Sequence, residues 1–481
     1  MRIALINDGM YPYRAGVGGT WSHRLVRGLP EHAFHLVSVI DREPAVAAFY
    51  PPANTLSLTA IGTDGAPVGP ARGRAALQHR RAATHGAVLL CRSMLEDTPH
   101  SLAMFRSSLR RLTSTSATGN HPLHGVPLAA VLTDAWRAAT PSAGVGSLVR
   151  AALPPVSARD AADAAALLER ALRPLGTPLP MTDLGHATDA SLSALVAIAA
   201  KWRTGAPFVL SEHRTYLDAQ ILTGTVGRPA VRAVLLRFLR ALARLAYQEA
   251  SKIVVPNEQL RSFVLDHDVD RDKVAVVPYG VDPHGCPTLR GEPAEPIVTW
   301  LGPDRDLPTM VSALRLIRDE LPDARLIVAG PATGAAGRLG GEVSFLGPVT
   351  HRRSAYATGQ IVALSGRGDS MPYALIEAMM CGRPVVCQDN GGLASMAGLG
   401  ASIVAYDDPE ALAAGCLTLL HSRDRRRQQS IAAGQRARNL FGLRMTLDRY
   451  RIVYEESARD TAAPTAHLAG LYREAAAELA S

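Results

Sequence analysis

Asp369 and Glu377 lie eight residues apart in the C-terminal half of the chain, and their spacing says most about its chemistry. The sequence around them predicts a buried strand at 361–364, a glycine-rich turn, a helix that begins at Pro372 and a second strand from Pro384. Proline suits the first helical turn, where its missing N–H has no helical partner to lose. Asp369 then lies in the turn and Glu377 inside the helix. One acid can therefore reach one end of a ligand while the other acid reaches the opposite end.

The turn between this strand and this helix is also a candidate anion site. Free backbone N–H groups and the positive end of the helix dipole point at one spot there. Ser370 and Met371 lie at this spot, between Asp369 and Pro372. For an acid pair alone, a surface aspartate and a dipole-stabilised glutamate would be the simpler interpretation.

The segment from Asp369 to Val386 resembles the acid-x7-Glu signature of retaining, nucleotide-sugar-dependent glycosyltransferases of family 4. The flanking text Pro-x-x-x-Ile-Glu-Ala-Met-x-x-Gly-x-Pro-Val-Val extends the resemblance beyond the acid pair. The resemblance implies that Glu377 binds the ribose hydroxyls of the donor nucleotide and that Asp369 lies against the donor sugar. The family normally has glutamate at the first position, so Asp369 is one methylene shorter than expected.

The N-terminal end of the chain predicts a second ligand-binding turn. A buried strand at 3–6 is followed by Gly18 and Gly19, and an amphipathic helix is expected from about Ser22. Glycines ahead of a helix let the backbone approach an anion or a sugar closely. Their spacing is not the dinucleotide fingerprint, so a nicotinamide-dependent oxidoreductase is disfavoured. The loop resembles the Gly-Gly loop of these glycosyltransferases, and its Tyr-Pro-Tyr lead-in at 11–13 is closest to the branch that includes the Pel exopolysaccharide glycosyltransferase.

His213 is the candidate catalytic residue of the N-terminal half. It follows a strand at 207–210, and ligands collect at the carboxyl ends of strands in open α/β sheets. The text Ser-Glu-His-x-x-Tyr at 211–216 resembles the Pel-type branch, which implies that His213 lies near the donor sugar and the acceptor. A histidine hydrogen-bonded within a loop is the alternative. His186 matches another family position, for which a structural role is favoured. Trp21 could stack on an acceptor, although such aromatics more often belong to the core.

The main departure from the family pattern lies at 301–308. The family has Gly-Arg-x-x-x-x-Lys-Asp after this strand, whereas this chain has Pro303 in place of the arginine and a loop about four residues short. Arg305, just before Asp306, could replace the lysine because a guanidinium chelates phosphate oxygens. The alternative is an exposed Arg305 and a degraded phosphate site. Leu346 resembles the segment against which the nucleotide base lies.

Composition bounds the class of protein. A length of 481 residues with 47% hydrophobic residues predicts a globular protein of two or three domains. Its apolar runs are too short to span a bilayer, and its five scattered cysteines form neither a disulfide framework nor a metal motif. The net charge of +8 comes almost entirely from arginine, with few lysines. We attribute this composition to codon bias rather than to a surface that binds nucleic acid. Because a strand follows the first two residues directly, we expect a cytoplasmic protein.

Alternation of strands and helices predicts an α/β fold with doubly wound parallel sheets. The resemblance implies two Rossmann-like domains facing a cleft, the GT-B fold, with C-terminal helices crossing back. We expect an N-terminal, acceptor-side domain at 1–280 that carries an insertion at about 41–180, read as a helical cap. A nucleotide-sugar-binding domain is expected at 281–445 and a helical segment at 446–481.

By this resemblance, the chain is expected to move a sugar from a nucleoside diphosphate sugar to a hydroxyl acceptor with retention, in polysaccharide or glycoconjugate synthesis. Neither a cofactor nor a metal is expected, because oriented cations and backbone dipoles supply much of the stabilisation. The expected partners are a nucleotide sugar and a carbohydrate or lipid-linked acceptor, without nucleic acid; peripheral association with a membrane or a synthase complex stays open. The alternative is a catalytically degenerate, glycosyltransferase-like subunit that binds a nucleotide or a partner enzyme.

Overall fold

The chain forms two compact units. The computed structural model describes residues 1–41, 46–64, 74–96, 98–116, 121–139, 153–215, 228–302, 306–330, 342–347, 349, 352–365, 373–389 and 393–459. The first unit comprises Met1–Val255, Arg261–Ala275 and Arg451–Ser481, and the second comprises Pro256–Leu260 and Val276–Tyr450. Within the described residues, no helix is both long enough and apolar enough to cross a membrane.

The first unit is built on a sheet that has seven strands in the described part of the chain, in the order β3-β2-β1-β4-β5-β6-β7. The pairings from β3 through to β6 are parallel. The strands are β1 (Arg2–Asn7), β2 (Ala33–Ile40), β3 (Thr55–Gly62), β4 (Leu184–Ala187), β5 (Phe208–Ser211), β6 (Lys252–Val255) and β7 (Val274–Val276). Runs such as 3–6 and 208–210 are apolar without alternation because helices cover both faces of a parallel sheet.

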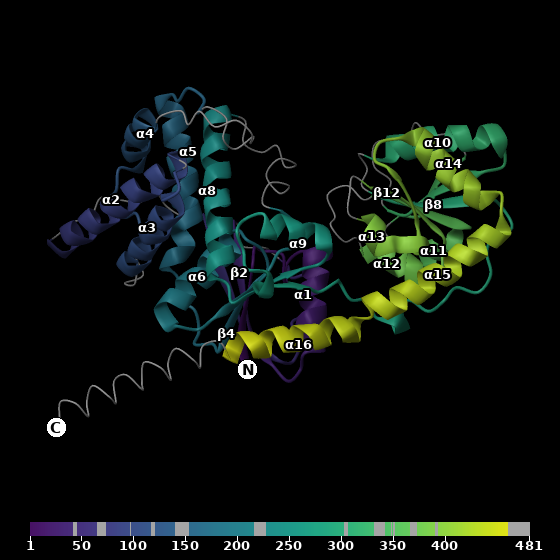
Figure 1. Ribbon diagram of the computed structural model, residues 1–481, viewed down its shortest axis with the longest axis horizontal. Coiled ribbons are helices and arrows are strands. Elements are labelled where there is room, and N and C mark those ends of the chain that lie inside the picture. The colour runs from purple at the N-terminus through teal and green to yellow at the C-terminus, as the bar shows by residue number, and fades with distance from the viewer. Residues whose placement is uncertain are drawn as a thin grey trace. The chain divides into compact units, whose positions relative to one another are not determined.

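Helices of two kinds surround this sheet. Those that follow strands are α1 (Val17–Gly28), α6 (Leu192–Thr204) and α9 (Glu258–Leu265). A separate helical layer contains α2 (Arg74–Leu95), α3 (Ser101–Thr115), α4 (Leu128–Ala138) and α5 (Ala158–Leu172), which pack on one another and on α8 (Pro229–Glu249) (Figure 1). An insertion that begins at about residue 41 does not fit β3, because β3 belongs to the main sheet and lies at its edge.

The second unit repeats the same winding. Its described sheet has the order β10-β9-β8-β11-β12-β13, with parallel pairing throughout. The strands are β8 (Ile297–Leu301), β9 (Arg325–Val328), β10 (Val343–Phe345), β11 (Ile361–Ser365), β12 (Val385–Asp389) and β13 (Ser402–Ala405). This is the strand order 3-2-1-4-5-6 of doubly wound sheets, in which ligands bind outside the carboxyl ends of the strands.

The helices of the second unit complete its core. They are α10 (Leu307–Glu320), α11 (Arg352–Thr358), α12 (Tyr373–Met380), α13 (Leu393–Ala397), α14 (Pro409–Leu420) and α15 (Arg423–Phe441). Trp300 of β8, Met310 of α10 and Cys416 of α14 are buried in one cluster on this sheet. The predicted α/β architecture of two Rossmann-like units is confirmed.

The last described helix is shared between the two units. α16 (Leu443–Arg459) belongs to the second unit as far as Tyr450 and to the first unit from Arg451. In the first unit, Arg451 forms an ion pair of 2.5 Å with Glu31, and the buried Tyr454 hydroxyl lies 2.7 Å from Nδ1 of His186. The expected C-terminal helix that crosses back is therefore present.

Candidate functional site

Glu377 lies on α12, which follows the carboxyl end of β11, and its side chain is only 10% exposed. The Tyr356 hydroxyl of α11 donates a hydrogen bond of 3.1 Å to Oε2 of Glu377. The Arg352 guanidinium lies 3.5 Å from the same oxygen and is half-exposed. Burial, followed by the Glu377 charge, raises the pKa of Tyr356 well above its usual range, so the hydroxyl stays protonated and donates. The structure thus holds the Glu377 carboxylate in a fixed orientation.

Several predicted donor-site residues lie outside the described part of the chain. These are Pro303 and Arg305 of the shortened loop, and Asp369, Ser370, Met371 and Pro372 of the turn before α12. The residues that flank the shortened loop are described. Gly302 has no room for a side chain, because a Cβ there would lie 2.5 Å from the Trp300 ring. Asp306 is buried and accepts a hydrogen bond of 2.8 Å from the Tyr406 hydroxyl.

Leu346 follows β10 at the carboxyl edge of the second sheet. Its N–H donates a hydrogen bond of 3.0 Å to the carbonyl of Val328, which fixes the backbone. Its side chain is 43% exposed, unlike most large apolar residues of this unit. Gly347 follows with a φ of +71°, a conformation that favours glycine. Leu346 therefore presents an apolar surface at the edge where the sequence predicted a nucleotide base.

Gly18 and Gly19 lie in the first turn of α1, which begins at Val17. The expectation that this helix begins at about Ser22, with both glycines in a loop before it, was wrong. Gly19 is buried, and a Cβ there would collide with the carbonyl oxygen of Arg14 and approach the Phe49 ring to 2.9 Å. The glycine keeps the preceding turn close to the helix, and this packing function has no obvious sequence signal.

Replacing Gly19 with alanine is expected to destabilise the protein by about 1–3 kcal/mol, as for other overpacked sites. Gly18→Ala is the matched control, because its Cβ would meet only the flexible end of Met10, at 2.9 Å. Urea denaturation measures both variants. Equal stabilities for Gly18→Ala and Gly19→Ala would contradict the packing argument.

The three aromatic residues singled out in the first unit lie together. The Trp21 ring packs edge-on against His213, with ring centres 4.4 Å apart, and against His186 at 5.6 Å. Trp21 is 3% exposed, so it belongs to the core and the idea that it stacks on an acceptor is not supported. His186 is fully buried, with Nε2 2.8 Å from the Ser211 hydroxyl and Nδ1 bonded to Tyr454. This arrangement gives His186 the structural role that the sequence favoured.

His213 follows β5 at the carboxyl edge of the first sheet, as predicted. The residue is half-buried, and both of its ring nitrogens are shielded from solvent. Burial, with a smaller contribution from the Arg214 charge, lowers the pKa of His213 to about 3. The imidazole is therefore neutral at physiological pH. Its role as a catalytic residue stays a prediction.

Acid should weaken the fold through His186. Burial, followed by electrostatic repulsion from the neighbouring His213 when both rings are protonated, lowers the pKa of His186 from 6.5 to about 3. Below pH 6.5, His186 binds a proton in the unfolded chain but not in the folded chain. The free energy of unfolding therefore decreases as the pH is lowered to about 3. The contribution is about 1.4 kcal/mol per pH unit. The expected result is that wild type loses stability more steeply than His186→Gln between pH 6 and 4.5, measured by urea denaturation. Parallel profiles would contradict it.

Sequence reasoning missed a polar cluster at the same edge of the first sheet. Asp8 follows β1, Asp189 follows β4, and Glu212 follows β5. Asp8 accepts hydrogen bonds from the Ser191 hydroxyl and, at 3.1 Å, from the Ser193 N–H. Burial, reinforced by the charge of Asp189, raises the pKa of both Asp8 and Glu212 well above the usual range. The available signal was one acid within two residues of the end of each of three strands.

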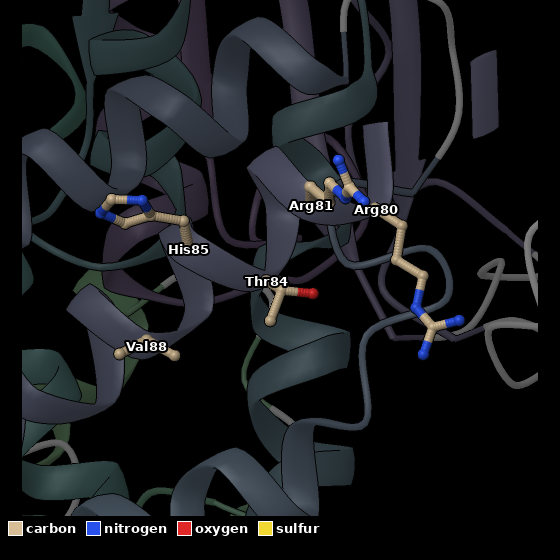
Figure 2. Close-up of a pocket in the computed structure, with 5 residues that line it drawn as sticks. All are labelled: Arg80, Arg81, Thr84, His85 and Val88. Atoms are coloured by element: carbon tan, nitrogen blue, oxygen red, sulfur yellow. The ribbon is translucent and has the colours of Figure 1, made fainter. Parts of the chain in front are cut away.

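The structure also has an open hollow of about 570 Å³ along α2. Figure 2 shows its described lining residues, Arg80, Arg81, Thr84, His85 and Val88. All five come from one helix, so no second described element brings a complementary group to them, and we assign no function to this hollow. Elsewhere in the described residues, no three His, Cys, Asp or Glu side chains are grouped so that they could hold a metal ion.

Comparison with known proteins identifies the family. Residues 1–272, more than half of the chain, match the family model described as a domain of unknown function, DUF3492. The chain belongs to the DUF3492 family. In this DUF3492 protein, residues 297–422 match a second model, described as glycosyl transferases group 1. That match supports a glycosyltransferase family; the finer assignments to family 4 and to the Pel-type branch stay predictions.

The DUF3492 protein is also similar to curated proteins over part of its length. It is 28% identical over 251 residues to a D-inositol 3-phosphate glycosyltransferase from Mycolicibacterium gilvum, covering 46% of this chain and 55% of that protein. Another protein of the same name, from Thermomonospora curvata, is 29% identical over 328 residues, covering 59% of this chain and 73% of that protein. The chain spans about half the length of the first curated relatives that it matches.

Solved structures share its GT-B-like fold. Sucrose-phosphate synthase from Thermosynechococcus elongatus has a TM-score of 0.57 at 15% identity, covering 95% of this chain and 98% of that chain. Anabaena HepE in complex with UDP and glucose has a TM-score of 0.52 at 14% identity, covering 94% and 99%. At such identities the likeness concerns the fold alone.

Proposed function

We propose that this protein is a glycosyltransferase that moves a sugar from a nucleoside diphosphate sugar to a hydroxyl acceptor with retention. The observation that carries the proposal is the Glu377 carboxylate. It is buried on α12 beside the carboxyl edge of β11, is oriented by Tyr356 and Arg352, and lies in the segment matched to glycosyl transferases group 1. Such an oriented carboxylate suits a pair of ribose hydroxyls, because each of its oxygens accepts hydrogen bonds.

The donor nucleotide is proposed to bind the second unit. Glu377 holds the ribose, and the exposed face of Leu346 packs against the base. Arg305 binds the diphosphate, while Asp369 and the turn residues Ser370, Met371 and Pro372 bind the donor sugar. A uridine diphosphate sugar is the first donor to test, because HepE, which shares the fold, was solved with UDP-glucose. Gly18, Gly19 and His213 of the first unit remain the proposed residues near the sugar.

The proposed reaction is balanced without a protein nucleophile. The acceptor oxygen forms a bond to the anomeric carbon as the bond from that carbon to the diphosphate oxygen breaks. The leaving phosphate takes the acceptor proton, and nucleoside diphosphate is released. Arg305 stabilises the negative charge that develops on the diphosphate, and such preorganised stabilisation is often the largest contribution to catalysis. The names of the curated relatives suggest glycoconjugate synthesis as the setting.

A thermal-shift panel of nucleoside diphosphates and their sugars tests the proposal, followed by hydrolysis assays on every ligand that binds. The expected result is stabilisation by one nucleotide class and slow release of nucleoside diphosphate from its sugar. The shortened loop with Pro303, together with Asp369, favours one rival, a glycosyltransferase-like subunit that binds a nucleotide without turnover. Binding without release of nucleoside diphosphate with any acceptor would favour that rival.

Turnover is expected to be independent of divalent metal, because Arg305 and the backbone N–H groups before α12 are proposed to bind the diphosphate. Activity should be unchanged within error after addition of a chelator and after addition of magnesium or manganese. Loss of activity in the chelator and recovery with either metal would contradict this prediction.

A further inference from the structure

The first unit contains a small cavity, here called the Asp8 pocket, at the carboxyl ends of its first strands. Its volume is about 220 Å³. Its lining residues are Asp8, Gly9, Tyr13, Arg14, Val39, Ile40, Asp41, Thr63 and Leu192. Every one of them belongs to the first unit, and the pocket lies at the sheet edge where open α/β sheets bind ligands.

Backbone geometry forms the pocket. Gly9 has a φ of +66°, and a Cβ there would lie 3.1 Å from both the Val39 carbonyl and the Ile40 side chain. Glycine therefore lets the chain turn sharply after β1 and pass close to the end of β2. The Thr63 N–H donates a hydrogen bond of 2.8 Å to the Ile40 carbonyl, which brings the end of β3 to the same place.

The polar groups of the pocket suit hydroxyl groups. Asp8 lies on one side, held by Ser191 and Ser193 of the α6 N-terminus. Asp41 lies on another, and the Thr63 hydroxyl donates a hydrogen bond of 2.7 Å to its Oδ1. The pKa of Asp8 is raised by burial and by Asp189, so its carboxyl group can also donate when protonated. Together with the Arg14 guanidinium, these groups can both accept from and donate to hydroxyls.

The remaining wall of the pocket is apolar. An apolar wall favours a sugar ring over small ligands that are polar on every side. Val39, Ile40 and Leu192 supply aliphatic surface beside the carboxyl groups. A sugar ring has the same division, with C–H faces and a rim of hydroxyls. Among the described lining residues, a phosphate group would meet one cation, Arg14, against two carboxyl groups, Asp8 and Asp41. The volume is below the roughly 300–1,000 Å³ of pockets for drug-sized ligands, which suits one ring.

We propose that the Asp8 pocket binds one uncharged, polyhydroxylated ring, and that this ring belongs to the acceptor. The assignment of this ring to the acceptor rests on the proposed glycosyltransferase activity. The binding of a ring in the pocket does not. The inference separates this protein from the curated relatives that are named for an inositol phosphate acceptor. A free sugar or polyol is preferred here over its phosphate.

Saturation-transfer difference NMR on the full chain tests the pocket with four probes: D-glucose, myo-inositol, and the monophosphate of each. At least one neutral probe should give signals. Its monophosphate should bind at least about tenfold more weakly than the neutral probe. Asp8→Asn and Asp41→Asn should each weaken the neutral probe by about tenfold, the effect of one lost hydrogen bond to a charged group. Asp64→Asn is the matched control, since Asp64 and Asp41 both pair with Arg170, at 2.6 Å and 3.9 Å, but Asp64 does not line the pocket. It should bind as wild type.

Three results would overturn the pocket assignment: no signal from either neutral probe, equal or tighter binding of the phosphates, or unchanged binding in both Asp8→Asn and Asp41→Asn. Thermal shifts with the best nucleoside diphosphate run alongside, because they test the second unit and show that each variant is folded. If a neutral ring binds and no nucleotide does, the pocket stands and the transfer reaction fails. If the nucleotide binds and no neutral ring does, the pocket proposal fails and the donor site stands.

Discussion

Arg305→Ala is expected to lower turnover by roughly 10²–10³-fold, about 3–4 kcal/mol of transition-state stabilisation, while binding of the nucleoside changes little. Pro303 stands where the family 4 glycosyltransferase pattern that this segment resembles has a cation, so we expect Arg305 to supply most of the charge that stabilises the departing diphosphate. The contact strengthens as negative charge develops on the leaving group. Its loss should therefore appear in kcat much more than in the dissociation constant of the free nucleotide.

Two variants sharpen this test. Arg305→Lys should recover part of the rate, since a point charge supplies part of what a guanidinium fork supplies. Arg315→Ala is the control, because Arg315 is an exposed arginine of α10 in the same unit. Release of nucleoside diphosphate measures all three variants. If Arg305→Ala turns over at the wild-type rate, another arginine stabilises the diphosphate.

Glu377→Ala is expected to weaken binding of the best nucleoside diphosphate by about 30- to 150-fold, equivalent to 2–3 kcal/mol for charge-assisted hydrogen bonds. The carboxylate is fixed before the ligand arrives, because Tyr356 and Arg352 already contact Oε2. A preoriented acceptor pays little ordering entropy on binding, so its removal costs most of the interaction.

Calorimetry measures this affinity, with Tyr356→Phe as the comparison. That variant keeps the carboxylate and loses one hydrogen bond of 3.1 Å, so a smaller loss of affinity is expected. Circular dichroism should confirm that both variants are folded. Wild-type affinity in a folded Glu377→Ala would remove the ribose assignment and, with it, the main support for the proposed donor site.

The fold was predictable from sequence where burial leaves a periodic signal. The strand at 361–364 was found because it is an apolar run before a glycine-rich turn, and Glu377 was singled out by its spacing from Asp369 and by the text that flanks it. β3 was missed because Leu56 and Leu58 alternate with polar residues on an edge strand, inside a segment read as an insertion.

The candidate site was harder to predict, because its contacts join distant parts of the chain. Tyr356 and Arg352 lie 21 and 25 residues before Glu377, and no local sequence pattern links them to it. Asp8 and Asp41 meet at one pocket only because β1 and β2 are neighbours in the sheet. Trp21 looked available for a ligand because sequence shows residue type but not burial.

α16 has a consequence for how such proteins can be divided and recombined. The family match ends at residue 272, but the first unit also needs the chain from Arg451, which brings Tyr454 to His186 and Arg451 to Glu31. A gene fragment that stops at the family boundary would encode the unit without this helix. Exchange of one unit between related genes would therefore require two crossover points, so the halves of this protein are expected to be inherited together.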